Sequence, residues 1–432
     1  MLAFAHVVDL LANKFSGLRR RGFTGGFVSS GAFQRRSLWH SATSRLKSCR
    51  RRAADGRLTR SNACAPTLAL DWYGFCTSTD VVNQQQIVVI TGASAGVGRA
   101  TARAFARRGA SIGLIARGHA GLEATRDEVA ALGGRAFVYS ADVANAVQIE
   151  RAADAIEKAL GSIDVWINNA MTSVFSPISE LEADEIRRVT EVTYLGTVHG
   201  TLAALRRMRA RGHGTIVQVG SALAFRAIPL QAAYCAAKHA VQGFTESLRC
   251  ELLHDRSAIR VTMVHLPALN TPHFSWAKSR LPRKPQPVPP IYQPEIAADA
   301  ILWAVDHNRR ELQVGVPTAV AIEGNKLFPG LMDRYLSRHG YDSQQTDQPV
   351  EPNRRDNLWE PVPGDRGAHG DFGHRAADVS PHLWFNTHRG LLVAAATGIA
   401  AIAYATLASR TTTRAALQPR PSWEHVSRRL PV

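Results

Sequence analysis

A short apolar run, a glycine-rich turn and a helical stretch follow one another without interruption between Ile87 and Arg108. Residues 87–90 are Ile, Val, Val and Ile, and the turn that follows reads TGASAGVG over 91–98. Glycine lets the backbone turn tightly and approach a ligand closely, and the first N–H groups of the following helix attract anions. Such a turn between a buried strand and a helix predicts a site for the phosphates of a dinucleotide.

Strand and helix patterns continue to alternate beyond this turn. Repeated strand–helix units predict a parallel sheet with helices on both faces. The expected fold is therefore an α/β doubly wound parallel sheet (a Rossmann fold), formed by a single domain over 85–335 with extensions at both ends. Further strands are expected at 111–117, 136–140, 165–167, 215–219 and 311–316, and helices near 99–108, 121–132, 146–160, 231–254 and 294–307.

The second expected strand ends at Ala116 and is followed by Arg117. A site for NAD ordinarily carries Asp or Glu at this point to bind the ribose hydroxyls, whereas an arginine accommodates the 2′-phosphate of NADP. This chain offers no carboxylate there and adds a cation. We therefore expect Arg117 to bind the cofactor and NADP(H) to be preferred over NAD(H). A plain surface charge is the alternative interpretation of Arg117.

A serine, a tyrosine and a lysine are expected to meet at the carboxyl end of the sheet. Ser221 follows the strand at 215–219, and Tyr234 and Lys238 are four residues apart, so they share one face of the helix at 231–254. A nearby ammonium favours ionisation of a tyrosine, whose free pKa is ~10, and a serine hydroxyl can stabilise charge on a substrate oxygen. This combination predicts proton transfer between an alcohol and a carbonyl. Taken alone, the pair is also explained by a core tyrosine and a solvated lysine.

Residues of about 87–320 resemble the short-chain dehydrogenase/reductase family. The resemblance rests on motifs that occur in the family's order and spacing: TGASAGVG at 91–98, Asp142-Val143, Asn168-Asn169-Ala170, Ser221 and Tyr234-x-x-x-Lys238. It implies a catalytic domain that moves a hydride between a nicotinamide and a carbonyl or secondary alcohol. It also implies a homo-oligomer, because the family commonly forms dimers or tetramers through the helix that bears the tyrosine.

The resemblance also implies a role for each matching residue. Tyr234 would be the general acid/base, Lys238 would lower its pKa and hold the nicotinamide ribose, and Ser221 would position the substrate oxygen. Asp142 and Val143 would meet the adenine. The cofactor-binding residues would be Thr91, Gly92, Ser94, Gly96, Val97, Gly98, Arg117, Asp142, Val143, Asn168, Ala170, Tyr234, Lys238 and Thr271.

Three positions depart from the family's pattern. Thr193 stands where the family often has an Asn whose main-chain carbonyl holds a relay water, and on that ground Thr193 is counted among the catalytic residues. Met171 replaces the usual glycine after Asn-Asn-Ala, which would narrow the site near the nicotinamide. The Pro-Gly motif after the sixth strand appears as LPALNTP over 266–272, where Thr271 would meet the cofactor's amide.

Two classes of function remain open for this domain. The first is an oxidoreductase acting on a small-molecule carbonyl or alcohol, whose specificity would depend on the proline-rich segment 281–294. That segment is expected to be extended, and it occupies the position of the family's substrate lid. The second is a non-catalytic sensor or scaffold of the same fold that binds a dinucleotide. The presence of Ser221, Tyr234 and Lys238 favours the enzyme.

The first 84 residues form a basic extension. Residues 1–80 hold 13 Lys and Arg against 4 Asp and Glu, in a chain whose net charge is +17. A transit-type presequence, a basic tail for nucleic acid or membranes, and a disordered extension all fit this composition. Disorder is the favoured interpretation, and no nucleic-acid partner is expected. The five scattered cysteines lack CxxC or metal-ligand spacing, which suits a reducing compartment and predicts no metal site.

Three segments of different composition follow the domain. Residues 336–388 are rich in Pro, Gly and charged side chains and are expected to be a linker. Residues 389–409 contain an uncharged run, 390–408, that is long enough to cross a bilayer. Because many of its residues are Ala and Gly, a helix packed on the domain or on a partner is the alternative. The basic tail at 410–432 ends the chain.

The arginines around 390–408 bear on the orientation of such an anchor. More of them follow the apolar run than precede it, so the positive-inside rule would place the tail in the cytoplasm and the domain outside. NADP(H) is available inside the cell, which conflicts with that orientation. Because the cofactor motifs are the more specific signal, we expect a cytoplasmic catalytic domain, anchored to a membrane by 390–408.

Overall fold

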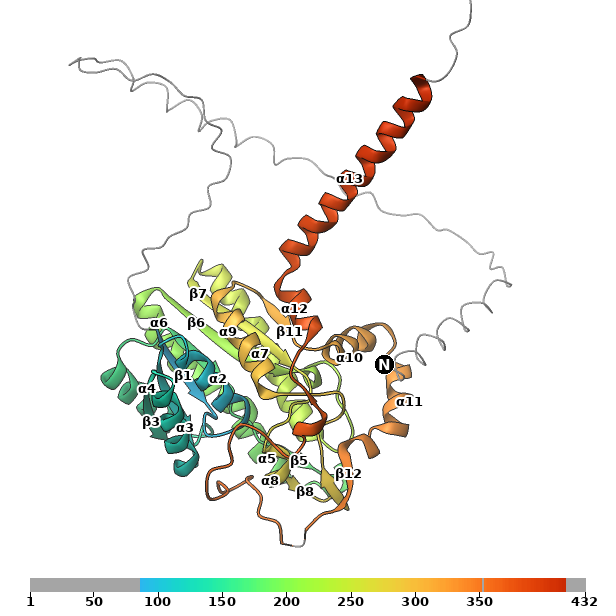
Figure 1. Cartoon of the computed structure of the whole chain (residues 1–432). Helices are drawn as coiled ribbons and strands as arrows, with labels where there is room; N and C mark the ends of the chain where they lie inside the picture. The colour runs from blue at the N-terminus through green and yellow to red at the C-terminus, as the bar shows by residue number, and fades with distance from the viewer. Residues whose placement is uncertain (1–85, 352, 417–432) are drawn as a thin grey trace, which may run out of the picture. The chain divides into compact units, whose positions relative to one another are not determined.

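The computed structural model describes residues 86–351 and 353–416, and its centre is a seven-stranded parallel sheet (Figure 1). The strand order is β11-β7-β6-β4-β1-β2-β3. The order reverses between β1 and β4, and ligands of such sheets bind outside the carboxyl ends of the strands at this switch point. The strands are β1 (Ile87–Thr91), β2 (Ser111–Ala116), β3 (Arg135–Ser140), β4 (Val165–Asn168), β6 (His213–Ser221), β7 (Ala258–Leu266) and β11 (Glu311–Gln313).

Helices cover both faces of the sheet, and the buried side chains form one cluster on each side. Val88 and Ile90 of β1 belong to one cluster and Val89 to the other, because successive side chains of a strand point to opposite faces. The doubly wound parallel sheet predicted from the sequence is therefore confirmed. One layer contains α2 (Gly96–Ala106), α3 (His119–Ala131) and α9 (Pro294–Asp306), and the other contains α4 (Ala146–Leu160), α6 (Gly196–Arg211) and α7 (Ala232–His254).

Local signals fix where several helices begin and end. The side chain of Asn145 accepts a hydrogen bond from the N–H of Gln148 and caps α4. Gly212 ends α6 in the left-handed conformation, with φ of +79°. Pro294 is the first residue of α9, a position where its missing N–H costs nothing. The helices expected at 146–160, 231–254 and 294–307 are each found within one residue of those limits.

Described parts of the segment 336–388 pack against the domain, whereas its composition predicts a linker. Two short strands of this segment, β12 (Gln345–Pro349) and β13 (Ala376–Ala377), pair with β9 (Arg283–Pro285) and β10 (Ile291–Tyr292). β9 and β10 belong to the proline-rich segment, which is extended as predicted. The pairing uses backbone groups, which almost every residue carries, so amino-acid composition gives no sign of it.

The last described element is α13 (Arg389–Ala416), which follows α10 (Val316–Leu327), α11 (Pro329–His339) and α12 (Pro381–Thr387). Its residues Arg389–Thr406 have a mean hydropathy of 1.4, and by length and composition they could cross a membrane. Apolar side chains along it, including Leu391, Val393 and Ile399, are exposed. The predicted N-terminal extension and residues 417–432 of the predicted tail lie outside the described residues.

Candidate active site

The glycine-rich turn joins β1 to α2 in a conformation that only glycine readily adopts. Gly92 and Gly96 have φ of +69° and +55°. A Cβ atom on Gly98 would come within 2.2 Å of the Gly92 carbonyl oxygen. The first N–H groups of α2 have no acceptor within the helix, so the turn presents donors suited to an anion.

A cavity of about 220 Å³ lies beside this turn. Many of its walls come from the carboxyl ends of the strands and the loops that follow them, as the topology of the sheet predicts. The predicted cofactor residues on its lining are Gly92, Ser94, Gly96, Val97, Arg117, Asp142, Val143, Ala170 and Thr271. The lining also contains residues to which the sequence assigned no role, chiefly Asn169, Trp276, Asn357, Pro361, Val362 and Arg366.

Thr91 and Gly98 support the turn and do not line the cavity. The Thr91 hydroxyl accepts hydrogen bonds from the N–H groups of Asn169 at 3.0 Å and Ala170 at 3.1 Å. It donates to the carbonyl of Ile167 at 3.3 Å. Thr91 therefore joins the end of β1 to the end of β4 and positions the loop that carries Ala170.

Asn168 points into a buried polar network. Its Oδ1 accepts a hydrogen bond from the indole N–H of Trp166 at 2.9 Å. Its Nδ2 donates to the Thr201 hydroxyl at 3.0 Å and to Gln218 Oε1 at 2.9 Å. The structure therefore does not bring the Asn168 side chain to the cavity, in contrast to its predicted cofactor-binding role. The neighbouring Asn169 lines the cavity instead.

Ser221, Tyr234 and Lys238 come together where β6 ends and α7 begins. The Nζ atom of Lys238 lies 5.7 Å from the centroid of the Tyr234 ring and donates a 2.7 Å hydrogen bond to the carbonyl of Val219. Burial raises the pKa of Tyr234, and a hydrogen bond with Ser221 partly offsets this rise. Burial lowers the pKa of Lys238 to about 8. The three side chains thus lie near one another in the structure, as their spacing predicts.

This cluster lies deeper than the cavity, and Met171 connects the two. Tyr234 packs among Val174, Val189 and Leu358, with Met171 at the edge of the same apolar group. Met171 is also part of the cavity lining. It therefore stands between the cavity beside the glycine-rich turn and the tyrosine, where the sequence predicts a narrowing of the site.

Thr193 lies in a π-helical turn, Glu191–Leu195, between α5 (Ala183–Thr190) and α6. Its hydroxyl accepts a 3.1 Å hydrogen bond from the N–H of Thr172 and donates a 3.0 Å bond to the carbonyl of the same residue. Its own carbonyl accepts a hydrogen bond from the Thr197 hydroxyl. The side chain of Thr193 consequently holds the segment that follows Met171.

Arg117 lines the cavity but is bonded to the C-terminal segment. It donates hydrogen bonds to the carbonyls of Asn357, Leu358 and Trp359, the last at 2.8 Å. Burial lowers the pKa of Arg117, while the nearby carboxylate of Asp142 acts in the opposite direction. Asp142 is in turn paired with a second arginine, Arg188, which the sequence did not single out.

A serine–histidine pair was also missed. The Ser173 hydroxyl and Nε2 of His273 are 2.8 Å apart, and His273 lines the cavity. Burial lowers the pKa of His273 to about 4, so its ring is neutral at pH 7. The two residues are 100 positions apart, so nothing adjacent in the chain reveals the pair. Among the described residues, no group of three His, Cys, Asp or Glu side chains could hold a metal ion.

A parallel doubly wound sheet with a glycine-rich turn between its first strand and the following helix is typical of dinucleotide-binding proteins. The family model for short chain dehydrogenases matches residues 86–280. The chain is 35% identical over 289 residues to the uncharacterised oxidoreductase YxnA of Bacillus subtilis. This match covers 66% of this chain and 81% of YxnA. This chain therefore belongs to the short-chain dehydrogenase/reductase family, whose enzymes act on CH–OH donors and bind NAD(P).

Other relatives agree with this assignment. The uncharacterised oxidoreductase Mb1570 of Mycobacterium bovis is 34% identical over 259 residues, covering 59% of this chain and 73% of that protein. Mouse dehydrogenase/reductase SDR family member 7B is 37% identical over 182 residues, covering 41% of this chain and 56% of that protein.

Proposed function

We propose that this enzyme uses NADP(H) to interconvert a carbonyl and a secondary alcohol of a small molecule, with Tyr234 as the general acid/base. The observation that carries the proposal is the contact among Tyr234, Lys238 and Ser221. All three side chains are nearly excluded from water, yet they are linked to the phosphate-binding turn through the Met171 segment. A buried phenol beside a buried ammonium is an arrangement suited to proton transfer.

The residues of the cavity fit a dinucleotide. The glycine-rich turn leaves no room for a Cβ atom at Gly98 and offers N–H groups to phosphates. Thr271 also lines the cavity. When bound, the reduced nicotinamide supplies a hydride to the carbonyl carbon. Tyr234 donates its phenolic proton to the carbonyl oxygen, and Ser221 holds that oxygen by a hydrogen bond. The positive charge of Lys238 stabilises the phenolate that results, which then regains a proton from solvent.

The preference for NADP(H) rests on Arg117. No carboxylate follows β2 at the position that would bind the ribose hydroxyls of NAD, and Arg117 lines the cavity there. The carbonyls of Asn357, Leu358 and Trp359 hold its guanidinium in place. An arginine has five N–H donors, so some of them are still available for a 2′-phosphate.

A turnover assay with a matched variant tests the proposal. The full chain is assayed with NADPH against a panel of aldehydes and ketones, following the loss of nicotinamide absorbance. We expect turnover with part of the panel, and a loss of about 10²–10⁴-fold in Tyr234→Phe, with NADPH binding retained. Binding of NADPH without turnover of any compound would instead favour a non-catalytic sensor of the same fold.

We further propose that α13 anchors a cytoplasmic catalytic domain to a membrane and that the enzyme is a homo-oligomer. Exposed apolar side chains along the 18 residues Arg389–Thr406 support the anchor. Carbonate extraction of membranes from cells expressing the full chain tests it. A chain that ends before Arg389 should be released while the full chain stays bound. Light scattering of the chain lacking α13 tests the oligomer.

A further inference from the structure

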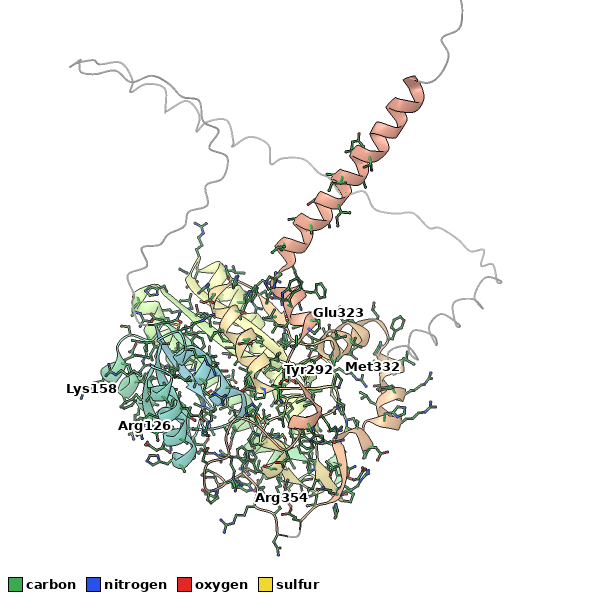
Figure 2. The ribbon with its side chains drawn as sticks, in the orientation of Figure 1. Arg126, Lys158, Tyr292, Glu323, Met332 and Arg354 are labelled. Carbon is green, nitrogen blue, oxygen red and sulfur yellow. The ribbon has the colours of Figure 1, made fainter. Side chains whose placement is uncertain are left out.

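Residues 354–372 form a strap across the cavity, and both ends of this strap are tied to the loop that follows β7. At one end, Arg354 (labelled in Figure 2) donates 3.0 Å hydrogen bonds to the carbonyls of Phe274 and Ser275. At the other end, the N–H of Phe372 donates to Oδ1 of Asn270 at 3.0 Å. The loop tied in this way also contains Thr271, a predicted cofactor residue.

The first half of the strap is held on the arginine side of the cavity. The carbonyl of Leu358 accepts hydrogen bonds from Arg188 at 3.0 Å and from Arg117 at 3.4 Å. The Leu358 side chain is fully buried in the apolar group that contains Tyr234. This half of the strap presents carbonyl oxygens to the two arginines and supplies no cation of its own to the lining.

The second half of the strap is attached to the phosphate-binding turn itself. Asp365 forms an ion pair with Arg99 in the first turn of α2. The carbonyl of Gly367 accepts a 3.1 Å hydrogen bond from the N–H of Gly96. Arg366 lies between these two fixed neighbours, so the strap holds its backbone against the turn.

Arg366 is placed to meet an anion. It lines the cavity together with Gly92, Ser94 and Gly96. In the part of the chain that the structure describes, its guanidinium has no hydrogen-bond or ion-pair partner. Because the Gly96 N–H is already bonded to Gly367, the turn has one donor fewer for a phosphate. The Arg366 guanidinium lies beside the turn and can replace the Gly96 N–H as a hydrogen-bond donor to a phosphate, with a positive charge in addition.

The cavity is small for a dinucleotide while the strap is in this position. It measures about 220 Å³, below the roughly 300–1,000 Å³ of ordinary ligand pockets. Five strap residues form part of its lining: Asn357, Pro361, Val362, Gly364 and Arg366. The strap therefore forms one wall of the space that a dinucleotide would occupy, and an outward shift of the strap would enlarge that space.

We propose that the strap is a clamp over the cofactor and that Arg366 binds the cofactor's pyrophosphate. This inference rests on the dinucleotide site of the proposed function. The pyrophosphate is the expected ligand, and not the 2′-phosphate, because both neighbours of Arg366 are bonded to the start of α2. Arg117 lies at the other end of the strap, where the lining meets β2.

Titration of the full chain with NADPH and with NADH, followed by nicotinamide fluorescence, tests the role of Arg366. We expect Arg366→Ala to weaken both complexes by about tenfold or more, as loss of a charge-assisted hydrogen bond does, and to leave the ratio of the two affinities unchanged. Arg366→Lys should recover part of the loss. Arg355→Ala is the matched control, because Arg355 is an exposed strap arginine that does not line the cavity.

Three results would contradict the inference. If Arg366→Ala and Arg355→Ala bound each nucleotide equally well, Arg366 would not belong to the binding site. If Arg366→Ala lost affinity for NADPH alone, Arg366 would bind the 2′-phosphate and not the pyrophosphate. Asp365→Asn weakens the attachment to Arg99 and should speed NADPH dissociation, whereas tighter binding would show that the strap obstructs the site. If the unaltered chain bound neither nucleotide, the proposed function itself would fail, which is a different outcome from an unchanged Arg366→Ala.

Discussion

Lys238 and Tyr234 are buried side by side, with the lysine Nζ 5.7 Å from the centroid of the tyrosine ring. Burial moves the pKa of each group toward its neutral form, lowering that of Lys238 to about 8 and raising that of Tyr234. The folded protein therefore holds a charged lysine at neutral pH at a cost in stability. Such a cost is typical of residues retained for function.

Replacing Lys238 by methionine should stabilise the protein and abolish turnover. A pKa lowered from 10.5 to about 8 corresponds to roughly 3 kcal/mol, while the variant also loses the hydrogen bond to Val219, at about 1 kcal/mol. We expect a net gain of about 1–2 kcal/mol in the free energy of unfolding at pH 7. Urea denaturation of the two proteins measures it. A variant less stable than the parent would contradict this account of the buried ammonium.

The same lysine predicts a pH dependence. Between pH 8 and 10 the unfolded chain keeps the Lys238 proton that the folded protein loses, so the free energy of unfolding rises with pH. Lys238→Met lacks this rise, and the difference between the two proteins should shrink across the window. Above pH 10 the raised pKa of Tyr234 acts in the opposite direction, so measurements stop there. A difference that stays constant with pH would contradict the prediction.

Glu185 should stabilise the packing of α5 against the segment that contains Lys278 and Arg280. It is fully buried in α5 and accepts 2.8 Å hydrogen bonds from Lys278 and Arg280. Burial alone would raise the pKa of Glu185, but these hydrogen bonds lower it to about 2. Glu185→Gln should lower the free energy of unfolding by about 2 kcal/mol at pH 7, and Glu180→Gln, on an exposed residue nearby, should not.

The contribution of Glu185 should disappear in acid. A carboxylate with a lowered pKa stabilises the folded state above its unfolded pKa of roughly 4.3, and this stabilisation is lost as pH falls toward 2. Parent and Glu185→Gln proteins should therefore differ less at pH 3 than at pH 7 in urea denaturation. An equal difference at both pH values would mean that the charge on Glu185 contributes nothing.

Thr193 should act mainly through its hydroxyl. Thr193→Val keeps the shape of the side chain but leaves the buried N–H and carbonyl of Thr172 without their partner. We expect a loss of about 1–3 kcal/mol in the free energy of unfolding, and a smaller loss of turnover than in Tyr234→Phe. Thr193→Ser keeps both hydrogen bonds and should stay close to the parent protein. An unaltered stability in Thr193→Val would show that these bonds are dispensable.

The parts of the fold and site that could be predicted are those specified by nearby residues. The sheet follows from apolar runs bounded by glycines, and the glycine-rich turn from the need for positive φ at Gly92 and Gly96. Tyr234 and Lys238 are neighbours because α7 places residues four apart on one face. Such relations depend on spacing within one element, which a sequence displays directly.

The contacts that the sequence does not predict join residues far apart in the chain. They use backbone carbonyls, which every residue carries. The carbonyls of Leu358 and Gly367 bind Arg188 and Gly96, so a segment of Pro, Gly and Asp that looks like a linker becomes a wall of the cavity. Asn168 was misjudged for a related reason. Its amide is satisfied by three partners on other parts of the sheet and α6, of which only Trp166 is close in sequence.

The measurement that tests the central claim most directly is the affinity of the full chain and of Arg117→Ala for NADPH and NADH. We expect the full chain to bind NADPH at least about tenfold more tightly, since a guanidinium–phosphate contact is a charge-assisted hydrogen bond. Arg117→Ala should bind NADPH about as weakly as NADH, and its loss of affinity for NADPH should far exceed any loss for NADH, because Arg188 still holds the Leu358 carbonyl of the strap. Equal affinities in the unaltered chain, or an equal loss of both nucleotides in the variant, would contradict the assignment of this enzyme to NADP(H).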